Sequence, residues 1–239
     1  MTCERAHPPL EEPERPVLRR TLLLMGAMPL AVQFKPLLAQ IKKVPPATIA
    51  AHLAGRLAGT PNGDFQLIGY VTYVEGLGGN LFAGAPSEQT ALISFRTDPF
   101  RFNVIPNGTA LQVSRQIVPG GPPSQTRIYY NPAPARDFTK PETFSTGQQI
   151  GVLQARSFQG ILVPSQMFSI AGSMDVTSTN DLVLGGVSVN LNILSSVITI
   201  TFAGVPPSAA EFAAATSVSI PLSGTIVVGD PQAIPRAGR

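Results

Sequence analysis

The densest group of polar and charged side chains in this chain lies in residues 129–145. Charged residues make up only 13% of the sequence, yet this segment combines aromatic rings with four charges. Its candidate ligand-binding residues are Tyr129, Tyr130, Arg136, Asp137, Lys140 and Glu142. A loop of this kind over the mouth of a barrel could hold a ligand between charges and aromatic walls. The alternative is an ordered Ω-loop, in which Asn131 and Asp137 satisfy nearby backbone groups and the charges face water.

Three further charges lie on the apolar faces of predicted strands. Alternate residues of a strand share one face, and this parity places Arg115, Arg156 and Glu75 among apolar side chains. If these faces lined one cavity, the three charges would converge there, because a buried charge needs a partner. Such a cluster could bind an anionic ligand or stabilise an oxyanion. The alternative is that the three side chains lie near strand ends and extend into solvent.

The common catalytic and metal-binding side chains are almost absent. The only histidines are His7 and His52, the only cysteine is Cys3, and there is no tryptophan. Histidine carries most proton transfer at neutral pH, and imidazole and thiolate are the usual transition-metal ligands. Residues 175–181 are rich in oxygen ligands but lack the glycine and closing glutamate of an EF-hand loop, so we predict a polar turn there. We therefore predict no catalytic residue, no metal and no cofactor, and no pattern nominates a pair of glycosidase carboxylates.

The N-terminal segment carries a feature of a different kind. Arg19 and Arg20 precede 14 apolar-rich residues, 21–34, and Lys35 ends that stretch. Paired arginines before such a stretch resemble the bacterial twin-arginine export signal, and the stretch is too short to span a bilayer. The resemblance implies export to the periplasm or the extracellular space, transient membrane contact, and cleavage after Ala39 or Ala50. A buried or partner-binding helix is the other interpretation.

The net charge of +3 is unevenly distributed. Residues 1–59 carry eight Lys and Arg against four Glu, which gives +4, and residues 60–239 carry nine against ten, which gives −1. The body of the chain therefore has no excess of positive charge for a phosphate backbone, and we predict that it does not bind nucleic acid.

Short alternating segments predict an antiparallel all-β fold of about ten strands, a barrel or, alternatively, a sandwich. Asn107-Gly108 is predicted as a two-residue hairpin turn. Ser208 and Glu211 form a capping-box pattern that predicts one short helix over 208–215. A membrane-spanning barrel fits less well, because aromatic residues are only 7% of the chain. The predicted strands are 67–74, 89–97, 102–106, 109–113, 127–130, 149–158, 161–170, 172–177, 181–184, 187–194, 197–202 and 218–228.

The expected organisation has four parts. Residues 1–39 resemble the export signal, 40–63 form a linker or short helix, 64–230 form the barrel or sandwich, and 231–239 form a tail. The helix is suggested by Ile49, Leu53 and Leu57, which stand four residues apart.

Three classes of function are compatible with these patterns. The leading hypothesis is an exported, noncatalytic β-barrel that binds a small or apolar ligand or a protein partner. The first alternative is a small cyclase- or isomerase-type barrel enzyme that acts through Arg, Glu and Tyr electrostatics. The second is a structural surface or coat subunit, for which low charge and exposed apolar strands would serve.

Overall fold

The structure, a computed structural model, describes residues 44–61, 63–77, 80–116, 124–184, 186–194 and 196–229. The chain divides into two compact units, Met1–Leu37 and Leu38–Arg239, and the described residues all belong to the second. The resemblance to an export signal at Arg19 and Arg20, together with Cys3 and the predicted tail 231–239, therefore lies outside the described residues.

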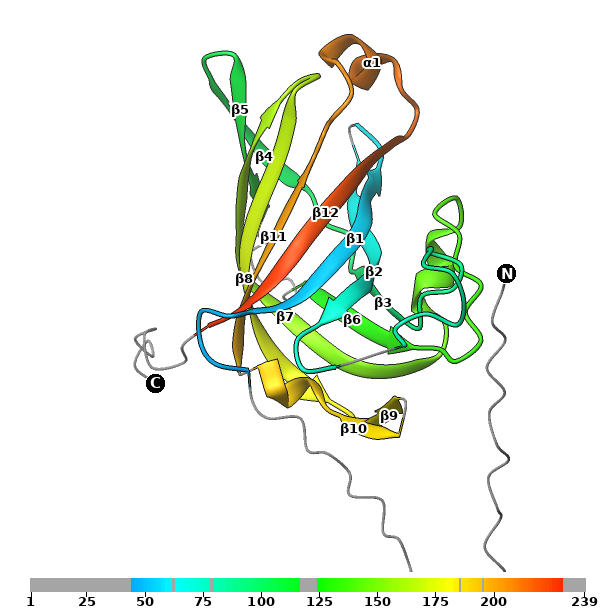
Figure 1. Cartoon of the computed structure of the whole chain (residues 1–239). Coiled ribbons are helices and arrows are strands. Elements are labelled where there is room, and N and C mark those ends of the chain that lie inside the picture. The colour runs from blue at the N-terminus through cyan, green and yellow to red at the C-terminus, as the bar shows by residue number, and fades with distance from the viewer. Residues whose placement is uncertain are drawn as a thin grey trace, which may run out of the picture. The chain divides into compact units, whose positions relative to one another are not determined.

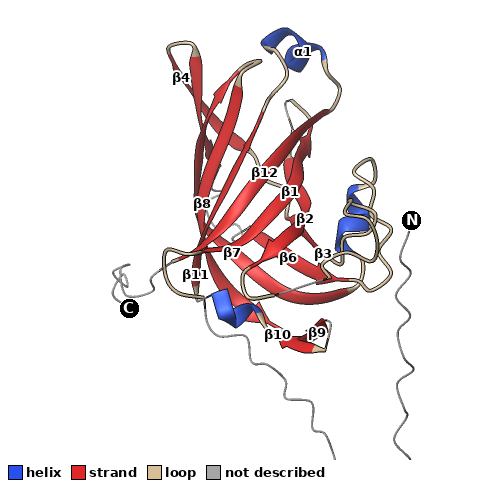
Figure 2. Cartoon of the chain, in the orientation of Figure 1, coloured by secondary structure: helices blue, strands red, loops and turns tan. Residues whose placement is uncertain are grey.

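The described part of the chain is built almost entirely from strands (Figures 1 and 2). The non-strand elements are two 3₁₀ helices, η1 (Pro141–Ser145) and η2 (Leu191–Leu194), and the short helix α1 (Ala209–Ala214). The strands are β1 (Ile49–Gly59), β2 (Phe65–Val74), β3 (Ile93–Thr97), β4 (Phe102–Asn107), β5 (Ala110–Arg115), β6 (Gln125–Tyr130), β7 (Gln148–Val163), β8 (Met167–Thr179), β9 (Leu182–Leu184), β10 (Val187–Val189), β11 (Val197–Gly204) and β12 (Val218–Val228).

Eight of these strands close into an antiparallel barrel. The order around it is β7-β6-β3-β2-β1-β12-β11-β8, and β8 pairs back onto β7. The hairpin β4–β5 extends the sheet where β5 pairs with the far end of β7, and β9 and β10 form a separate small pair. The predicted antiparallel barrel is thus confirmed, in preference to the sandwich. Closure leaves none of these eight strands with an open edge along the ring.

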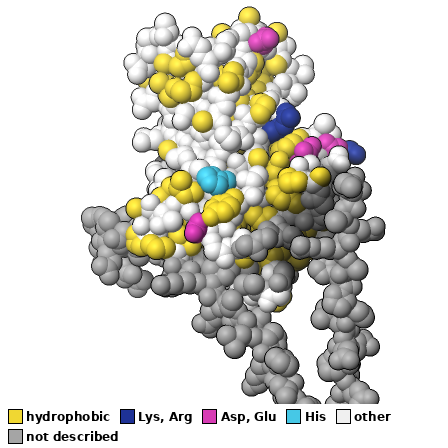
Figure 3. All heavy atoms as spheres, viewed as in Figure 1, with side chains coloured by type: hydrophobic (Ala, Val, Ile, Leu, Met, Phe, Trp, Pro, Cys, Tyr) yellow, Lys and Arg dark blue, Asp and Glu magenta, His cyan; other side chains and the backbone are white. Residues whose placement is uncertain are grey.

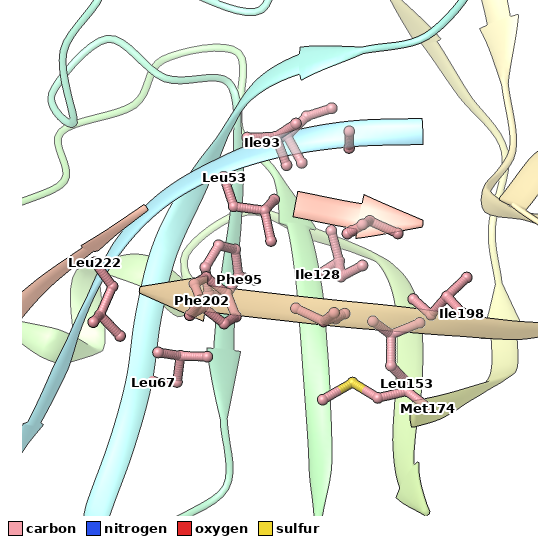
Figure 4. Packing of buried hydrophobic residues seen from close by; sticks show 14 of the residues in the cluster. Leu53, Leu67, Ile93, Phe95, Ile128, Leu153, Met174, Ile198, Phe202 and Leu222 are labelled. Atoms are coloured by element: carbon pink, nitrogen blue, oxygen red, sulfur yellow. The ribbon is translucent and has the colours of Figure 1, made fainter. Parts of the chain in front are cut away.

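Side chains fill the interior of the barrel (Figure 4). Phe95 and Phe202 meet near its middle with ring centroids 6.0 Å apart. Their space depends on two paired glycines, Gly55 and Gly69, because a Cβ on Gly69 would lie 2.5 Å from Cζ of Phe95 and 2.3 Å from the carbonyl oxygen of Ala54. The missing side chains on β1 and β2 therefore allow an aromatic core.

The prediction of a linker or short helix over residues 40–63 is wrong for residues 49–59. Ile49–Gly59 is strand β1, which pairs with both β2 and β12. A four-residue spacing such as that of Leu53 and Leu57 also places both side chains on one face of a strand, and both are buried. Because this segment pairs with a strand on each side, it adopts the strand repeat and not the helical repeat. The barrel therefore begins before residue 64.

The boundary between β7 and β8 also differs from the prediction. The two strands meet at a turn of residues 164–166, inside the segment predicted as one strand, and Ser165 has a φ of 62° there. Residues 175–179, predicted as a polar turn, continue β8 instead. Two register shifts interrupt the β7–β8 pair, one at Thr177 of β8 and one at Arg156 of β7, and a long bulged hairpin of this kind leaves little trace in an alternation pattern.

The hairpin β4–β5 is present, but its turn is shifted by one residue. Asn107 pairs with Ala110, so the central positions are Gly108 and Thr109, and Gly108 alone has a positive φ, of 63°. Glycine at the first central position is typical of a type II′ turn, whereas a turn centred on Asn107-Gly108 would be of type I′. Residues that flank such a turn form a hydrogen-bonded pair, so Pro106 falls where an N–H would face away from the hairpin. Proline at that point removes a hydrogen-bond donor from the outer edge of β4, which disfavours pairing with a further strand.

Helix α1 follows the sequence prediction closely. The amide of Glu211 donates to Oγ of Ser208 at 3.2 Å, and the Glu211 carboxylate accepts from the Ser208 amide at 2.8 Å. Both halves of the capping box are therefore formed. In the part of the chain that the structure describes, no helix has the length and apolar character needed to cross a membrane.

Candidate functional site

One end of the barrel opens into a cavity of about 210 Å³, which we call the mouth cavity. The hairpin β4–β5 and helix α1 stand at this end (Figure 1), and hydrophobic side chains gather over the same end in the space-filling view (Figure 3). The lining is mainly apolar and comes from strands, loops and helix α1, which are distant in the sequence. It comprises Leu57, Pro61, Gly63, Phe65, Arg101, Phe102, Val104, Leu111, Val113, Leu162, Phe168, Phe212 and Ile220.

Aromatic rings form one wall of the mouth cavity. The ring of Phe102, on β4, lies 5.4 Å from Phe65, 5.2 Å from Phe100 and 6.1 Å from Phe168, centroid to centroid. These contacts are edge-to-face or tilted, which is the favourable geometry for aromatic pairs. They tie the projecting hairpin to β2 and β8, so the wall is held by several rings packed against one another.

The mouth cavity has one charged lining residue. Arg101 donates from Nε to Oδ1 of Asp64 at 2.7 Å, and both side chains are more than half exposed. This ion pair at the rim is surrounded by solvent and contributes little to stability. It places one guanidinium beside an apolar space without adding net charge, an arrangement suited to orienting a ligand.

The space found inside the described part of the barrel is much smaller. A void of about 20 Å³ lies among Leu53, Phe95, Met174 and Phe202 and their neighbours. That is the size of a single water molecule, and a water would also need two or more polar partners. Its one polar lining group is Thr126, whose hydroxyl lies 3.9 Å from the sulfur of Met174. A small-molecule site therefore fits the mouth, not the interior.

The polar segment 129–145 does not lie over this mouth. Together, residues 80–92 and 131–147 form what we call the side lobe, which packs on the outer face of β2 and β3. Ser94, whose neighbour Phe95 points inward, donates to the carbonyl of Phe144 at 2.9 Å. Phe138 stacks on Phe144 at 4.8 Å and meets Tyr70 at 6.2 Å. The lobe thus covers the side of the barrel, and its position corrects the interpretation of a loop over the mouth.

Local hydrogen bonds account for much of this segment. Asn131 accepts from the amide of Ala133 at 3.0 Å, and Asp137 accepts from the amide of Thr139 at 2.8 Å. The hydrogen bonds from Thr139 lower the pKa of Asp137. These are the backbone contacts that the Ω-loop interpretation expects. Among the other predicted ligand residues, Lys140 and Glu142 are exposed, Tyr129 and Tyr130 pair within the sheet, and Arg136 is buried.

The structure does not bring Arg115, Arg156 and Glu75 together. Arg156 donates to Asp175 at 2.7 Å, and Glu75 accepts from the hydroxyl of Tyr73. The guanidinium of Arg115 lies 5.8 Å from the ring centroid of Phe100, and burial lowers its pKa. None of the three lines the mouth cavity or the interior void. The register shift between Ala155 and Ser157 places a bulge at Arg156, which breaks the parity on which the predicted cluster depended.

The remaining candidate chemistry is also dispersed. His52 is exposed on β1, with its ring 5.3 Å from that of Tyr73. Within the described ranges, no group of three or more His, Cys, Asp or Glu side chains could hold a metal ion.

A scan against protein-family models found no matching family. Searches of curated proteins and of solved structures likewise found no match to this chain. The function is therefore inferred from the geometry of the mouth.

Sequence reasoning missed the residues that line the mouth cavity. The sequence held one indication of this site in the hairpin β4–β5. Its strands carry apolar residues on both faces, although the hairpin extends beyond the core of the barrel. Val104 lines the mouth and Ile105 faces the other way, yet they are 52% and 56% exposed. Apolar side chains that project beyond a closed barrel are an indication of a binding surface.

Proposed function

We propose that the chain is a noncatalytic barrel protein that binds a small apolar ligand in the mouth cavity. The observation that carries this proposal is the cavity itself, about 210 Å³ with a mainly apolar lining. An apolar cavity of about 150 Å³ is enough to hold benzene. Ligand sites are usually concave and apolar with a few polar groups that fix orientation, and the mouth matches that description.

The rim of the mouth supports a more specific ligand class. Arg101 uses Nε for Asp64, and its two terminal nitrogens have no hydrogen-bond partner among the described residues. These donors would suit an acceptor on the ligand, such as a carbonyl, hydroxyl or carboxylate oxygen. The ligand is then an apolar body with one acceptor group at the solvent end.

Two adjacent residues of β4 provide a matched test. We expect Val104→Asp to weaken binding of the uncharged fluorophore N-phenyl-1-naphthylamine by about tenfold or more, because a carboxylate beside bound apolar surface loses hydration. Ile105→Asp should leave the affinity unchanged, since Ile105 is equally exposed but does not line the cavity. Fluorescence titration of the full chain measures both, and equal affinities for the two variants would refute the mouth as the site.

The proposal includes export by the twin-arginine route, with cleavage after Ala39. Of the two candidate cleavage points, the one after Ala50 would cut within β1, where Ala50 is fully buried. Protein recovered from the periplasm or medium of a bacterial host should therefore begin at Gln40. The double variant Arg19→Lys, Arg20→Lys should be retained in the cytoplasm, whereas Arg15→Lys should be exported normally. N-terminal sequencing decides, and an intact Met1 on exported protein would contradict the proposal.

A further inference from the structure

The side lobe contains an ionised side chain that is buried without a counter-ion. Arg136 is 0% exposed, and it is the only charged residue in this state among those the structure describes. Its Nη2 donates to the carbonyl oxygen of Leu92 at 3.2 Å, whereas Nε and Nη1 have no hydrogen-bond partner within the described ranges. The single bond to Leu92 anchors the guanidinium where the lobe meets the start of β3.

Among the described residues, no carboxylate compensates this charge. Burial lowers the pKa of Arg136 to about 10, and no neighbouring charge acts against that effect. The acidic residues of the side lobe are either exposed or interact with other groups. Glu142 is exposed, and Asp137 accepts hydrogen bonds from Thr139. The charge of Glu88 contributes to raising the pKa of Tyr70. A pKa near 10 still leaves the side chain protonated at neutral pH. Arg136 therefore carries a positive charge away from both water and anions.

Burial of a charge without a partner is energetically unfavourable. Buried donors are almost always satisfied, and a buried ion without a partner is strongly destabilising. Two guanidinium nitrogens are left without acceptors here, so the missing partner has to come from solution. A water molecule could accept a hydrogen bond but would not neutralise the charge, and a bulky anion would not fit beside a fully buried side chain.

We propose that Arg136 binds a small monovalent anion of the chloride class, enclosed between the side lobe and the outer face of the barrel. The anion neutralises the guanidinium and accepts from nitrogens that the protein leaves free. Because it would bind the folded lobe and not the unfolded chain, it stabilises the folded state by an amount that grows with the logarithm of its concentration above the dissociation constant. The mouth cavity is a separate site, so either proposal can fail without the other.

The test compares salts of different anions at one ionic strength. The melting temperature of the wild-type full chain should rise by about 2–4 °C or more as chloride replaces gluconate, and above the dissociation constant the rise should follow the logarithm of the chloride concentration. Arg136→Met should abolish this difference. Arg96→Met is the matched control and should keep it, because Arg96 also lies under the lobe but has acceptors at Gln66 and Ser145, at 3.2 and 3.4 Å.

A second measurement needs no variant. Chloride-35 NMR of the wild-type protein should show line broadening that saturates and is displaced by bromide. Two results would overturn the proposal: no saturable broadening, or the same chloride response in the wild type and in Arg136→Met. Either would mean that water alone satisfies the buried guanidinium. If Arg136→Met does not fold, the NMR result decides.

Discussion

Phe202→Ala should destabilise the barrel by about 3–5 kcal/mol, the usual cost of removing a fully packed phenylalanine. Phe202 is 2% exposed on β11 and packs against Phe95 in the middle of the interior. The surrounding strands are closed into a ring and cannot collapse into the vacated space, so the cost should lie at the upper end. Urea unfolding monitored by circular dichroism measures the change in the free energy of unfolding.

Ile105→Ala is the control for this stability loss. Ile105 is 56% exposed, so its truncation should change the free energy of unfolding by no more than about 0.5 kcal/mol. A small effect of Phe202→Ala, comparable to that of Ile105→Ala, would show that the interior is not packed as described.

Phe202→Ala also tests whether the fluorescent probe binds in the mouth cavity or in the interior of the barrel. Phe202 does not line the mouth cavity, and sites without shared partners act additively within about 0.5 kcal/mol, or about twofold in affinity. Folded Phe202→Ala protein should therefore bind N-phenyl-1-naphthylamine about as well as the wild type. A large loss of affinity would place the probe inside the barrel instead.

Local sequence patterns predicted the structure correctly where a pattern is compatible with only one structure. Ser208 and Glu211 predict a capped helix because their two hydrogen bonds involve only neighbouring backbone groups, and the helix is present. The strand Val218–Val228 was found with its observed bounds. The alternation of apolar residues likewise indicated a strand-built fold, and the barrel confirms it.

Local sequence patterns gave wrong predictions where pairing with distant strands determines the structure. The spacing of Leu53 and Leu57 fits a helix and a strand equally, and only pairing with β2 and β12 makes it a strand. The bulge at Arg156 cannot be read from alternation, because its position depends on the register with β8. The mouth cavity is harder still, since residues as distant as Leu57 and Ile220 line it and no local pattern connects them.

The candidate site residues illustrate the same division. Asn131 and Asp137 have local partners, which composition can indicate. The burial of Arg136 depends on the packing of residues 80–92 and 131–147 against β3, which composition cannot indicate. Its sequence context of prolines and alanines is that of an exposed loop, so an unpaired buried charge was not expected there.

Leu162→Trp should occlude the mouth cavity and weaken binding of the fluorescent probe by about tenfold or more. Leu162 lies near the end of β7, is only partly buried and lines the cavity, so an indole can extend into open space without displacing the core. The chain has no natural tryptophan, and the new indole would be the only one. Its emission should be shifted to the blue, as expected for a ring in apolar surroundings.

Met167→Trp is the matched control at the same end of the barrel. Met167 begins β8 directly after the β7–β8 turn, is 42% exposed and does not line the cavity. Its indole should emit at the wavelength of a solvated ring, and the affinity for the probe should match that of the wild type. The two variants add the same ring at one rim of the barrel and differ in whether it enters the cavity. Equal probe affinities would therefore mean that the cavity is not where apolar ligands bind.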